Sequence, residues 1–204
     1  MFWIISFVFN AMAWSLDCGQ ASVMSKIVCA ACVVLGLVSA QAATLEQMST
    51  DDMIARSTAI VRGRVVSSSA RLHGPLIYTH YVVQVSERLK GPEAAQLDVV
   101  LPGGAAGGLR QTFPGTPALT EGGEYLLFLW TGPSGLTQVI GLSQGVFTVS
   151  QNAGGDLTAS RPASAEAMLD SKTGRVIADQ SVRLRLRDLR SRVAVLCQGK
   201  GSSQ

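Results

Sequence analysis

The stretch Ile77 to Leu89, IYTHYVVQVSERL, has the clearest β-strand pattern in the sequence. Its side chains alternate with a period of two, which divides them between the two faces of a strand. One face carries Ile77, Thr79, Tyr81, Val83, Val85 and Leu89, and the other carries Tyr78, His80, Gln84, Ser86 and Arg88. A strand of about a dozen residues is long enough to coil around a small barrel, which indicates a β-rich fold.

The flanking segments continue this pattern. Ala59 to Val66 alternates in the same way, and Gly63 within it predicts a bulge or a sharp bend. Glu124 to Trp130 is too continuously apolar for a half-solvated strand, so we predict a central strand that is covered on both faces. Between them, after a turn at residues 90–92, a third strand is expected with inward side chains Leu97, Val99 and Leu101.

Shorter elements complete the predicted fold. Two strands are expected at Leu136 to Ile140 and at Val146 to Val149, followed by a tight turn at residues 152–155. A capping-box pattern predicts a short helix near residues 49–57, and apolar residues at helical spacing predict another near residues 184–196. The fold class is therefore mainly β: a small five-stranded OB-like barrel with a short N-terminal helix and a C-terminal helix.

The first 43 residues have the pattern of an export leader. Lys26 precedes the apolar run Ile27 to Val38, and Ala40-Gln41-Ala42 matches the small-x-small site of signal peptidase. The mature chain would then begin at Ala43 or Thr44. The run is shorter than the roughly 20 apolar residues of a spanning helix, which favours cleavage over an uncleaved membrane anchor.

The sequence divides into four predicted segments, and the leader predicts the compartment. Residues 1–23 are an over-extended start or an extra apolar leader, and residues 24–43 are the signal peptide. Residues 44–160 are the barrel domain, and residues 161–204 are a linker, an arginine-rich helix and a disordered tail. The protein is expected to be secreted or periplasmic. Outside the leader Cys197 is the sole cysteine, so it is a free or intermolecularly paired thiol.

Charge and motifs argue against several functions. The leader holds one basic and one acidic residue, so the modest net charge of +3 is unchanged without it and indicates no particular partner. The glycine-rich residues 103–108 match neither GxGxxG nor GxxxxGK[ST], and we interpret them as a flexible loop. His73 and His80 lack metal-ligand spacing to a carboxylate or thiol, and they are the only two histidines available as bases for a nucleophilic hydrolase. We therefore expect no catalytic residues, no metal and no cofactor.

Two surfaces are candidates for ligand binding. If the first two strands pair as in OB barrels, their outward residues Arg62, Arg64, Tyr78 and His80 could form one cationic and aromatic patch. The second candidate is a contact to an anionic surface such as lipid headgroups or acidic glycan. Its residues are Arg183, Arg185, Arg187, Arg190 and Arg192. For each surface the alternative is a solvated exterior without a ligand.

Three short motifs lie in the predicted strands: Ile60 to Val65 (IVRGRV), Tyr81 to Val85 (YVVQV) with Leu89 to Pro92 (LKGP), and Glu124 to Phe128 (EYLLF). Together they resemble the netrin-like, tissue-inhibitor-of-metalloproteinases type of OB-fold domain, including those of bacterial exported proteins. The resemblance covers residues 49–149 and implies a five-stranded barrel with flanking helices. The inhibitors chelate zinc with an N-terminal cysteine, which the predicted mature terminus lacks, so that chemistry does not transfer.

These observations predict an exported, non-enzymatic binding or accessory module of unknown ligand. An exported protein, a peptide or a glycan is the expected partner, whereas nucleic acid is a poor candidate outside the cytoplasm. Membrane contact is expected only through an uncleaved leader or the arginine-rich end. Two alternatives stay open: a surface-contact inhibitor or partner of a secreted protease, and a weak hydrolase.

Overall fold

Strands dominate the computed structural model, which describes residues 44–198. The predicted signal peptide at residues 24–43, residues 1–23 and the predicted tail from Gly199 lie outside the described residues. The mainly β class with two α-helices is confirmed for the described part. The elements are β1 (Thr44–Glu46), α3 (Thr50–Arg56), β2 (Ala59–His73), β3 (Leu76–Lys90), β4 (Gln96–Pro102), β5 (Gly104–Ala106), β6 (Leu109–Gln111), β7 (Glu124–Thr131), β8 (Thr137–Val139), the 3-10 helix η1 (Leu142–Gly145), β9 (Val146–Gln151), β10 (Leu157–Arg161), β11 (Ala167–Leu169), β12 (Val176–Ala178), β13 (Val182–Arg185) and α4 (Leu186–Gln198).

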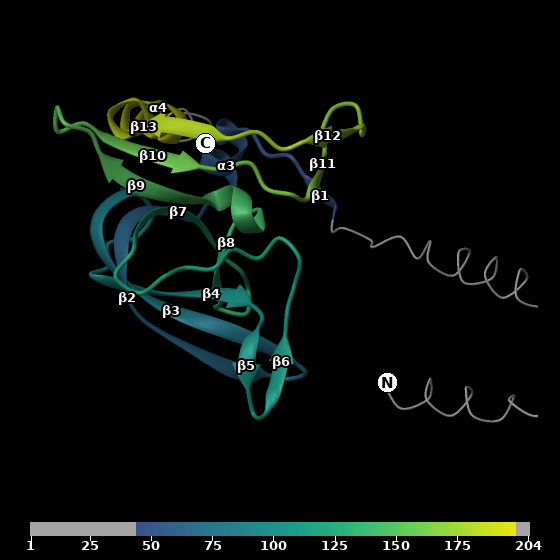
Figure 1. Cartoon of the computed structure of the whole chain (residues 1–204). Coiled ribbons are helices and arrows are strands. Elements are labelled where there is room, and N and C mark those ends of the chain that lie inside the picture. Colours follow the sequence, from purple (N-terminus) through teal and green to yellow (C-terminus); the bar gives the residue numbers. More distant parts are fainter. Residues whose placement is uncertain (1–43, 199–204) are drawn as a thin grey trace, which may run out of the picture. The chain divides into compact units, whose positions relative to one another are not determined.

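Five of the strands form a closed ring. β3 pairs antiparallel with both β2 and β4, and β2 also pairs with β7. β8 completes the ring because it pairs with β4 in parallel and with β7 antiparallel. The same sheet continues from β7 through β9 and β10 to β13, which forms its open edge (Figure 1). β7 therefore stands where the ring meets its extension.

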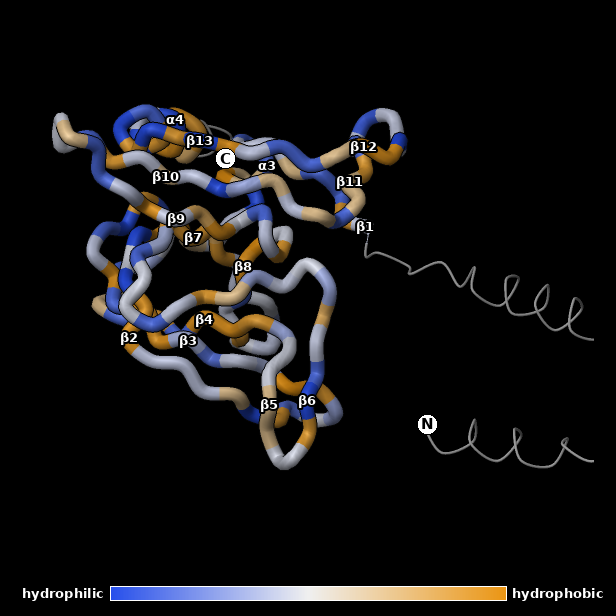
Figure 2. Tube along the Cα trace, in the orientation of Figure 1, coloured by the Kyte–Doolittle hydropathy of each residue, from blue (hydrophilic) through white to orange (hydrophobic). Residues whose placement is uncertain are grey.

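The two faces of β7 are buried in two different cores. Leu127 and Leu129 pack inside the ring with side chains of β2, β3 and β4. Leu126 and Phe128 pack on the opposite face against α3 and α4. All four are fully buried, which confirms the predicted central strand. Burying such side chains stabilises a fold by about 1.5–3 kcal/mol each. Figure 2 shows the hydrophobic character of β7 and of β4 in the ring.

The helices agree with their predicted signals, with one difference in extent. α3 begins at a complete capping box, in which Ser49 and Asp52 each accept a hydrogen bond from the other's backbone N–H. α4 buries Leu186, Leu189 and Val193, as their spacing predicts. It begins later than predicted because residues 182–185 are held extended by pairing with β10.

Two expectations about loops are wrong. Residues 103–108 are no open loop, because β5 and β6 pair as a hairpin that turns at Gly107 and Gly108. Both glycines have positive φ, 58° and 75°, which a two-residue hairpin turn favours. The segment from residue 161, predicted as a linker, contains three strands: β11 pairs with β1 and β12, and β13 pairs with β10. This segment is therefore part of the folded domain.

Candidate functional site

The first candidate patch is not brought together by the sheet. β2 and β3 pair, as the prediction assumed, but the register separates the four residues. The partner of Arg64 is Gln84, which lies four residues from His80 along β3, a distance of about 13 Å. Tyr78 is farther still and packs its ring edge-on against His73, with centroids 6.2 Å apart. Arg62 and Arg64 therefore do not share a patch with Tyr78 and His80.

Arg62 and Arg64 are engaged in contacts between strands. Arg62 Nε lies 3.3 Å from Glu87 Oε2, and its Nη1 lies 3.2 Å from Glu124 Oε1. Arg64 Nη1 donates a hydrogen bond of 2.5 Å to the carbonyl of Gly122, and its Nη2 lies 3.5 Å from Glu124 Oε2. These arginines therefore brace β2 against β3 and β7.

His80 forms a separate polar contact that bears on the hydrolase alternative. Its Nδ1 lies 2.8 Å from Asp98 Oδ2, and Ser69 stands opposite it on β2. Serine, histidine and aspartate are the residue types of a catalytic triad. Among the described residues, however, no hydrogen bond joins Ser69 to His80, and a triad requires that contact between nucleophile and base. The arrangement is an ion pair on the sheet when His80 is protonated.

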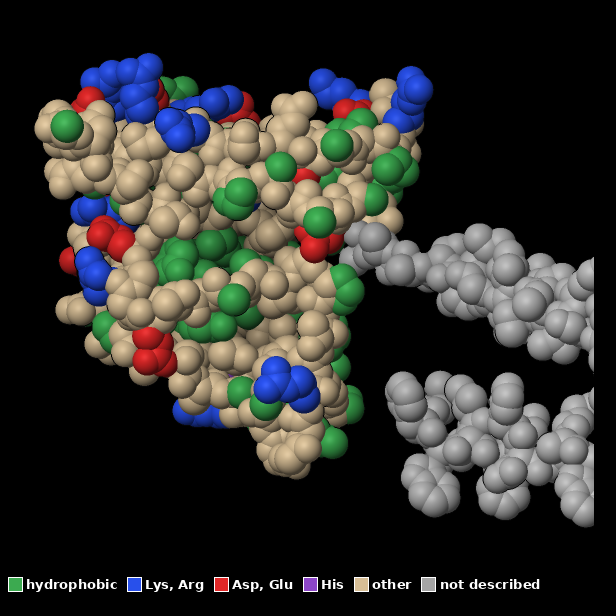
Figure 3. Space-filling model, viewed as in Figure 1, with side chains coloured by type: hydrophobic (Ala, Val, Ile, Leu, Met, Phe, Trp, Pro, Cys, Tyr) green, Lys and Arg blue, Asp and Glu red, His purple; other side chains and the backbone are tan. Residues whose placement is uncertain are grey.

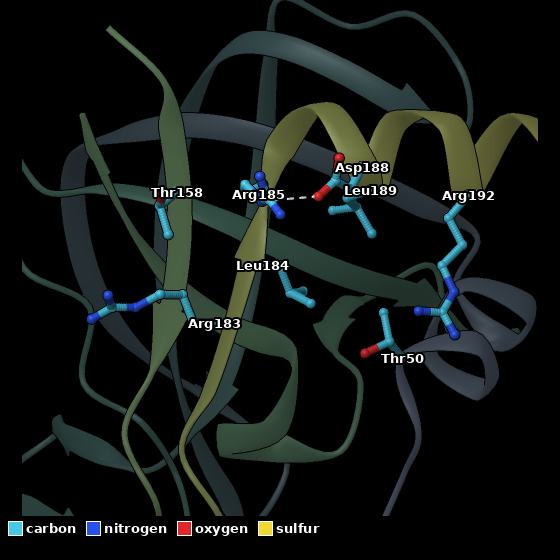
Figure 4. Close-up of a pocket in the computed structure, with 8 residues that line it drawn as sticks. All are labelled: Thr50, Thr158, Arg183, Leu184, Arg185, Asp188, Leu189 and Arg192. Carbon is cyan, nitrogen blue, oxygen red and sulfur yellow. Dashed lines mark ion pairs between the residues drawn. The ribbon is translucent and has the colours of Figure 1, made fainter. Parts of the chain in front are cut away.

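The arginine-rich segment, the second candidate, lines a groove along the open edge of the sheet. Arg183 and Arg185 lie on β13, and the other three arginines lie on α4. On β13, Val182 and Leu184 pack toward the core beneath α4, so the alternation turns Arg183 and Arg185 outward. The groove has a volume of about 530 Å³ (Figure 4). We call it the arginine groove; it is lined by Thr50, Thr158, Arg183, Leu184, Arg185, Asp188, Leu189 and Arg192.

Smaller hollows continue the arginine groove along β13. One of about 290 Å³ shares Arg183 with it and reaches Ser181. Another of about 130 Å³ shares Arg185 and reaches Arg190 on α4. Figure 3 shows basic side chains gathered over this end of the molecule, around α4 and β13. The surface beside β13 is therefore hollowed and cationic over its whole length.

Two of the arginines are paired with carboxylates of other elements. Arg190 holds Glu87 through two hydrogen bonds of 2.6 and 2.9 Å, and Arg192 holds Asp51 through two of 2.5 and 2.8 Å. These hydrogen bonds favour the charged forms, so they raise the pKa of both arginines and lower the pKa of Glu87 and Asp51. Arg190 and Arg192 therefore anchor α4 to β3 and α3.

Of the remaining three arginines, Arg183 and Arg185 leave positive charge in the groove. Arg185 and Arg187 share one carboxylate, that of Asp188, at 3.1 and 3.5 Å. Arg183 forms no ion pair with any residue in the described part of the chain. Guanidinium groups bind carboxylate, phosphate and sulfate through paired hydrogen bonds, so Arg183 and Arg185 are suited to an anionic ligand.

The lining of the arginine groove favours binding over catalysis. Thr50 and Thr158 supply hydroxyl groups, but a threonine nucleophile needs a neighbouring base. The one carboxylate in the lining, Asp188, is already paired with Arg185, and the lining contains no histidine, cysteine or lysine. The groove can therefore hold and orient an anion, but its lining has no unpaired side chain that could act as a general acid or base.

Sequence reasoning missed a buried ion pair beside this groove. Arg161, at the end of β10, contacts both carboxylate oxygens of Asp179, which also accepts a 2.8 Å hydrogen bond from the backbone N–H of Ser164. Burial acts to raise the pKa of Asp179, but the hydrogen bonds and the charge of Arg161 outweigh it and lower the pKa from 3.8 to about 2. No local pattern announces this pair, because the pairing of β10 with β13 brings its members together.

Three further findings bear on function. Among residues 44–198, no group of three or more His, Cys, Asp or Glu side chains is placed to hold a metal ion. Within the same range, no helix has the length and apolar character needed to cross a membrane. Comparisons with protein-family models, curated proteins and solved structures found no match to this chain. Its function must therefore be argued from its own geometry.

Proposed function

We propose that the described domain is an OB-like binding module of an exported protein, and that it binds an extended acidic segment of a partner protein in the arginine groove. One observation carries the proposal: the open edge strand β13 runs along a groove lined by Arg183, Arg185 and Arg192. The module has no catalytic role in this proposal. The partner is another exported protein.

The strand order supports an OB-like barrel. Around the ring the order is β7, β2, β3, β4 and β8, and the contact of β4 with β8 is parallel while the others are antiparallel. OB folds are five-stranded Greek-key barrels of this size that bind ligands on their surface strands and loops. The netrin-like resemblance stays a prediction that rests on the short motifs alone.

The edge of β13 supports an extended ligand. An edge strand presents backbone N–H and C=O groups on the side away from its neighbour, here β10. A peptide can pair with these groups and add a strand to the sheet. The four residues of β13 span about 13 Å, which sets the length of pairing at three or four peptide residues.

The side chains beside β13 favour an acidic peptide over a glycan. Alternate residues of an added strand would point to the two faces of the sheet. One face offers the guanidinium groups of Arg183 and Arg185, and the other offers the half-buried side chain of Leu184. Glutamate or aspartate alternating with an apolar residue matches both faces. A sulfated glycan would engage the arginines but neither the backbone edge nor Leu184.

The test is a binding titration with a defined peptide. The probe is a fluorescein-labelled peptide of alternating valine and glutamate, and fluorescence anisotropy gives its affinity. The double variant Arg183→Ala/Arg185→Ala should bind at least about tenfold more weakly, because each charged hydrogen-bonded contact contributes about 1.5–3 kcal/mol. Arg175→Ala, an exposed arginine between β11 and β12, is the matched control and should bind like the parent.

Amide hydrogen exchange distinguishes the possible ligands. Strand addition should slow exchange at residues 182–185 when the peptide is bound. If a heparin fragment binds through the same arginines and the peptide gives no amide protection, the ligand is a glycan and not a peptide. Equal affinity of the parent and the double variant would refute the arginine groove as the site.

A further inference from the structure

The β2–β3 hairpin and the β5–β6 hairpin end side by side, at the end of the ring away from α4 (Figure 1). They are joined by Gln111, whose Oε1 accepts a 2.7 Å hydrogen bond from the N–H of Ile77 and whose Nε2 donates one of 2.8 Å to the carbonyl of Pro75. Thr79 Oγ1 donates another, of 2.8 Å, to the carbonyl of Gly103. We call the ends of these hairpins, residues 71–76 and 106–110, the hairpin tip. These bonds hold the hairpin tip as one unit.

The hairpin tip exposes three leucines. The exposed fractions are 49% for Leu72, 38% for Leu76 and 58% for Leu109. Leu72 and Leu76 lie on opposite faces of the β2–β3 hairpin, because they stand opposite Ile77 and His73 respectively. Hydrophobic stretches are visible at this end beside β5 and β6 in Figure 2. The leucines therefore surround the end of the hairpins, which suits a surface that the tip enters end-on.

The same region carries positive charge without acidic residues. Neither residues 67–86 nor residues 99–120 contain aspartate or glutamate. Arg71 and Arg110 lie in the hairpin tip, are exposed, and form no ion pair with any described residue. Figure 3 shows a basic side chain flanked by hydrophobic ones over β5 and β6. The hairpin tip is therefore both cationic and apolar.

We infer that the hairpin tip docks on an anionic lipid bilayer. Leucine side chains at projecting turns can enter the acyl region, while arginines beside them reach the phosphate groups. A second copy of the chain fits less well, because self-association of this tip would bring the same positive charges together. The site is distinct from the arginine groove, so it adds a membrane contact to the proposed function.

Vesicle binding tests this inference on protein purified from cells that express the full chain. The vesicles are phosphatidylcholine alone or with about 30% phosphatidylglycerol. We expect sedimentation with the anionic vesicles and a decrease as salt rises from about 0.05 to about 0.5 M. Arg71→Ala/Arg110→Ala should lose at least about tenfold in binding, since each basic residue at such a surface contributes about fivefold. Arg175→Ala/Val176→Ser, which alters an exposed arginine and a 69% exposed valine elsewhere, is the control.

A fluorescence experiment locates the contact. Leu109→Trp is placed in a chain whose three natural tryptophans are replaced by phenylalanine, with circular dichroism as the check on folding. Its emission should shift to the blue with anionic vesicles and be quenched by brominated lipid. The inference would be overturned if the protein sedimented with anionic vesicles while the emission of the tryptophan at position 109 stayed unshifted. Equal binding to both kinds of vesicle would also overturn it. The inference would also fail if the protein formed an oligomer that the double variant Leu76→Ser/Leu109→Ser dissociates, because the leucines would then contact a second copy of the chain.

Discussion

Gly63 lies on β2 at a point where β3 leaves no room for a side chain. The pairing register shifts between Arg62 and Gly63, which is the bulge that the sequence predicted. A Cβ atom at this position would lie 2.6 Å from the carbonyl oxygen of Gln84 and 2.7 Å from Cγ1 of Val83. The absence of a side chain is therefore what allows the ring to bend here.

We predict that Gly63→Ala lowers the free energy of unfolding by about 2 kcal/mol, because backbone and core must shift to admit the methyl group. Urea denaturation measures this. Gly154→Ala is the matched control: its added Cβ would find Asn152 Oδ1 as nearest neighbour, at 3.4 Å, so it should change stability little. Equal stability of both variants would mean that the bulge accommodates a side chain.

Asp179 supplies a prediction for acid stability. Its pKa is lowered from 3.8 to about 2 in the folded protein, so its stabilising effect is complete above about pH 4 and is lost as the pH falls through 2. That loss amounts to about 2 kcal/mol. Asp179→Asn should lower stability at pH 7 by about 3 kcal/mol, because Arg161 is left buried without its partner.

Urea denaturation across this pH range measures the effect of Asp179. The difference between the parent and Asp179→Asn should shrink between pH 4 and pH 2. Asp156→Asn, at an exposed aspartate in the turn between β9 and β10, is the control and should follow the parent. A constant difference at every pH would contradict the assignment of the low pKa to Asp179.

Helix α4 is attached to the sheet by charge as well as by its apolar stripe. Glu87 on β3 accepts two hydrogen bonds from Arg190 and also lies 3.3 Å from Arg62. Arg62 in turn contacts Glu124 on β7. A network of partly exposed ion pairs therefore links α4, β3, β2 and β7.

Glu87→Gln should destabilise the protein by about 1 kcal/mol at low salt, because it weakens two contacts of this network. The effect should decrease at high salt as the charges are screened. Asp188→Asn is the control, since the Asp188 side chain is 60% exposed and pairs only with exposed arginines. If both variants lose the same stability, Glu87 contributes no more than a surface charge. Melting temperature at two salt concentrations gives the comparison.

The first strand that the structure describes, β1, lies next to the predicted cleavage site. β1 starts at Thr44 and pairs in parallel with β11, and Gln144 binds the backbone of Glu46 and Met48 at 2.9 and 2.8 Å. The residues that follow the predicted leader are therefore held by segments about 100 residues or more away along the chain. This arrangement is compatible with a mature start at Ala43 or Thr44, which stays a prediction.

N-terminal sequencing of the protein recovered from outside the cytoplasm tests this start. Ala43 or Thr44 is expected as the first residue, because Ala40 and Ala42 occupy the small-residue positions that signal peptidase reads. A membrane-bound product that begins at Met1 or Met24 would contradict both cleavage and the proposed export as a free domain.

The sequence by itself determined the strands of the ring and the start of α3, because the signals for these elements are local. The alternation in Ile77 to Leu89, the apolar run of β7 and the capping box at Ser49 each act over a few residues. Composition was misleading at residues 103–108, where glycines serve a hairpin turn and not a flexible loop.

Only the tertiary structure decided which charged residues are available to a ligand. Arg190 and Arg192 have partners 103 and 141 residues away, whereas Arg183 on the neighbouring strand has none among the described residues. The bulged register of β2 and β3 likewise separated Arg64 from His80, which alternation alone had placed together. Ion pairs and register depend on which strands and helices meet. These contacts are set by the burial of side chains from distant parts of the described chain in the two cores.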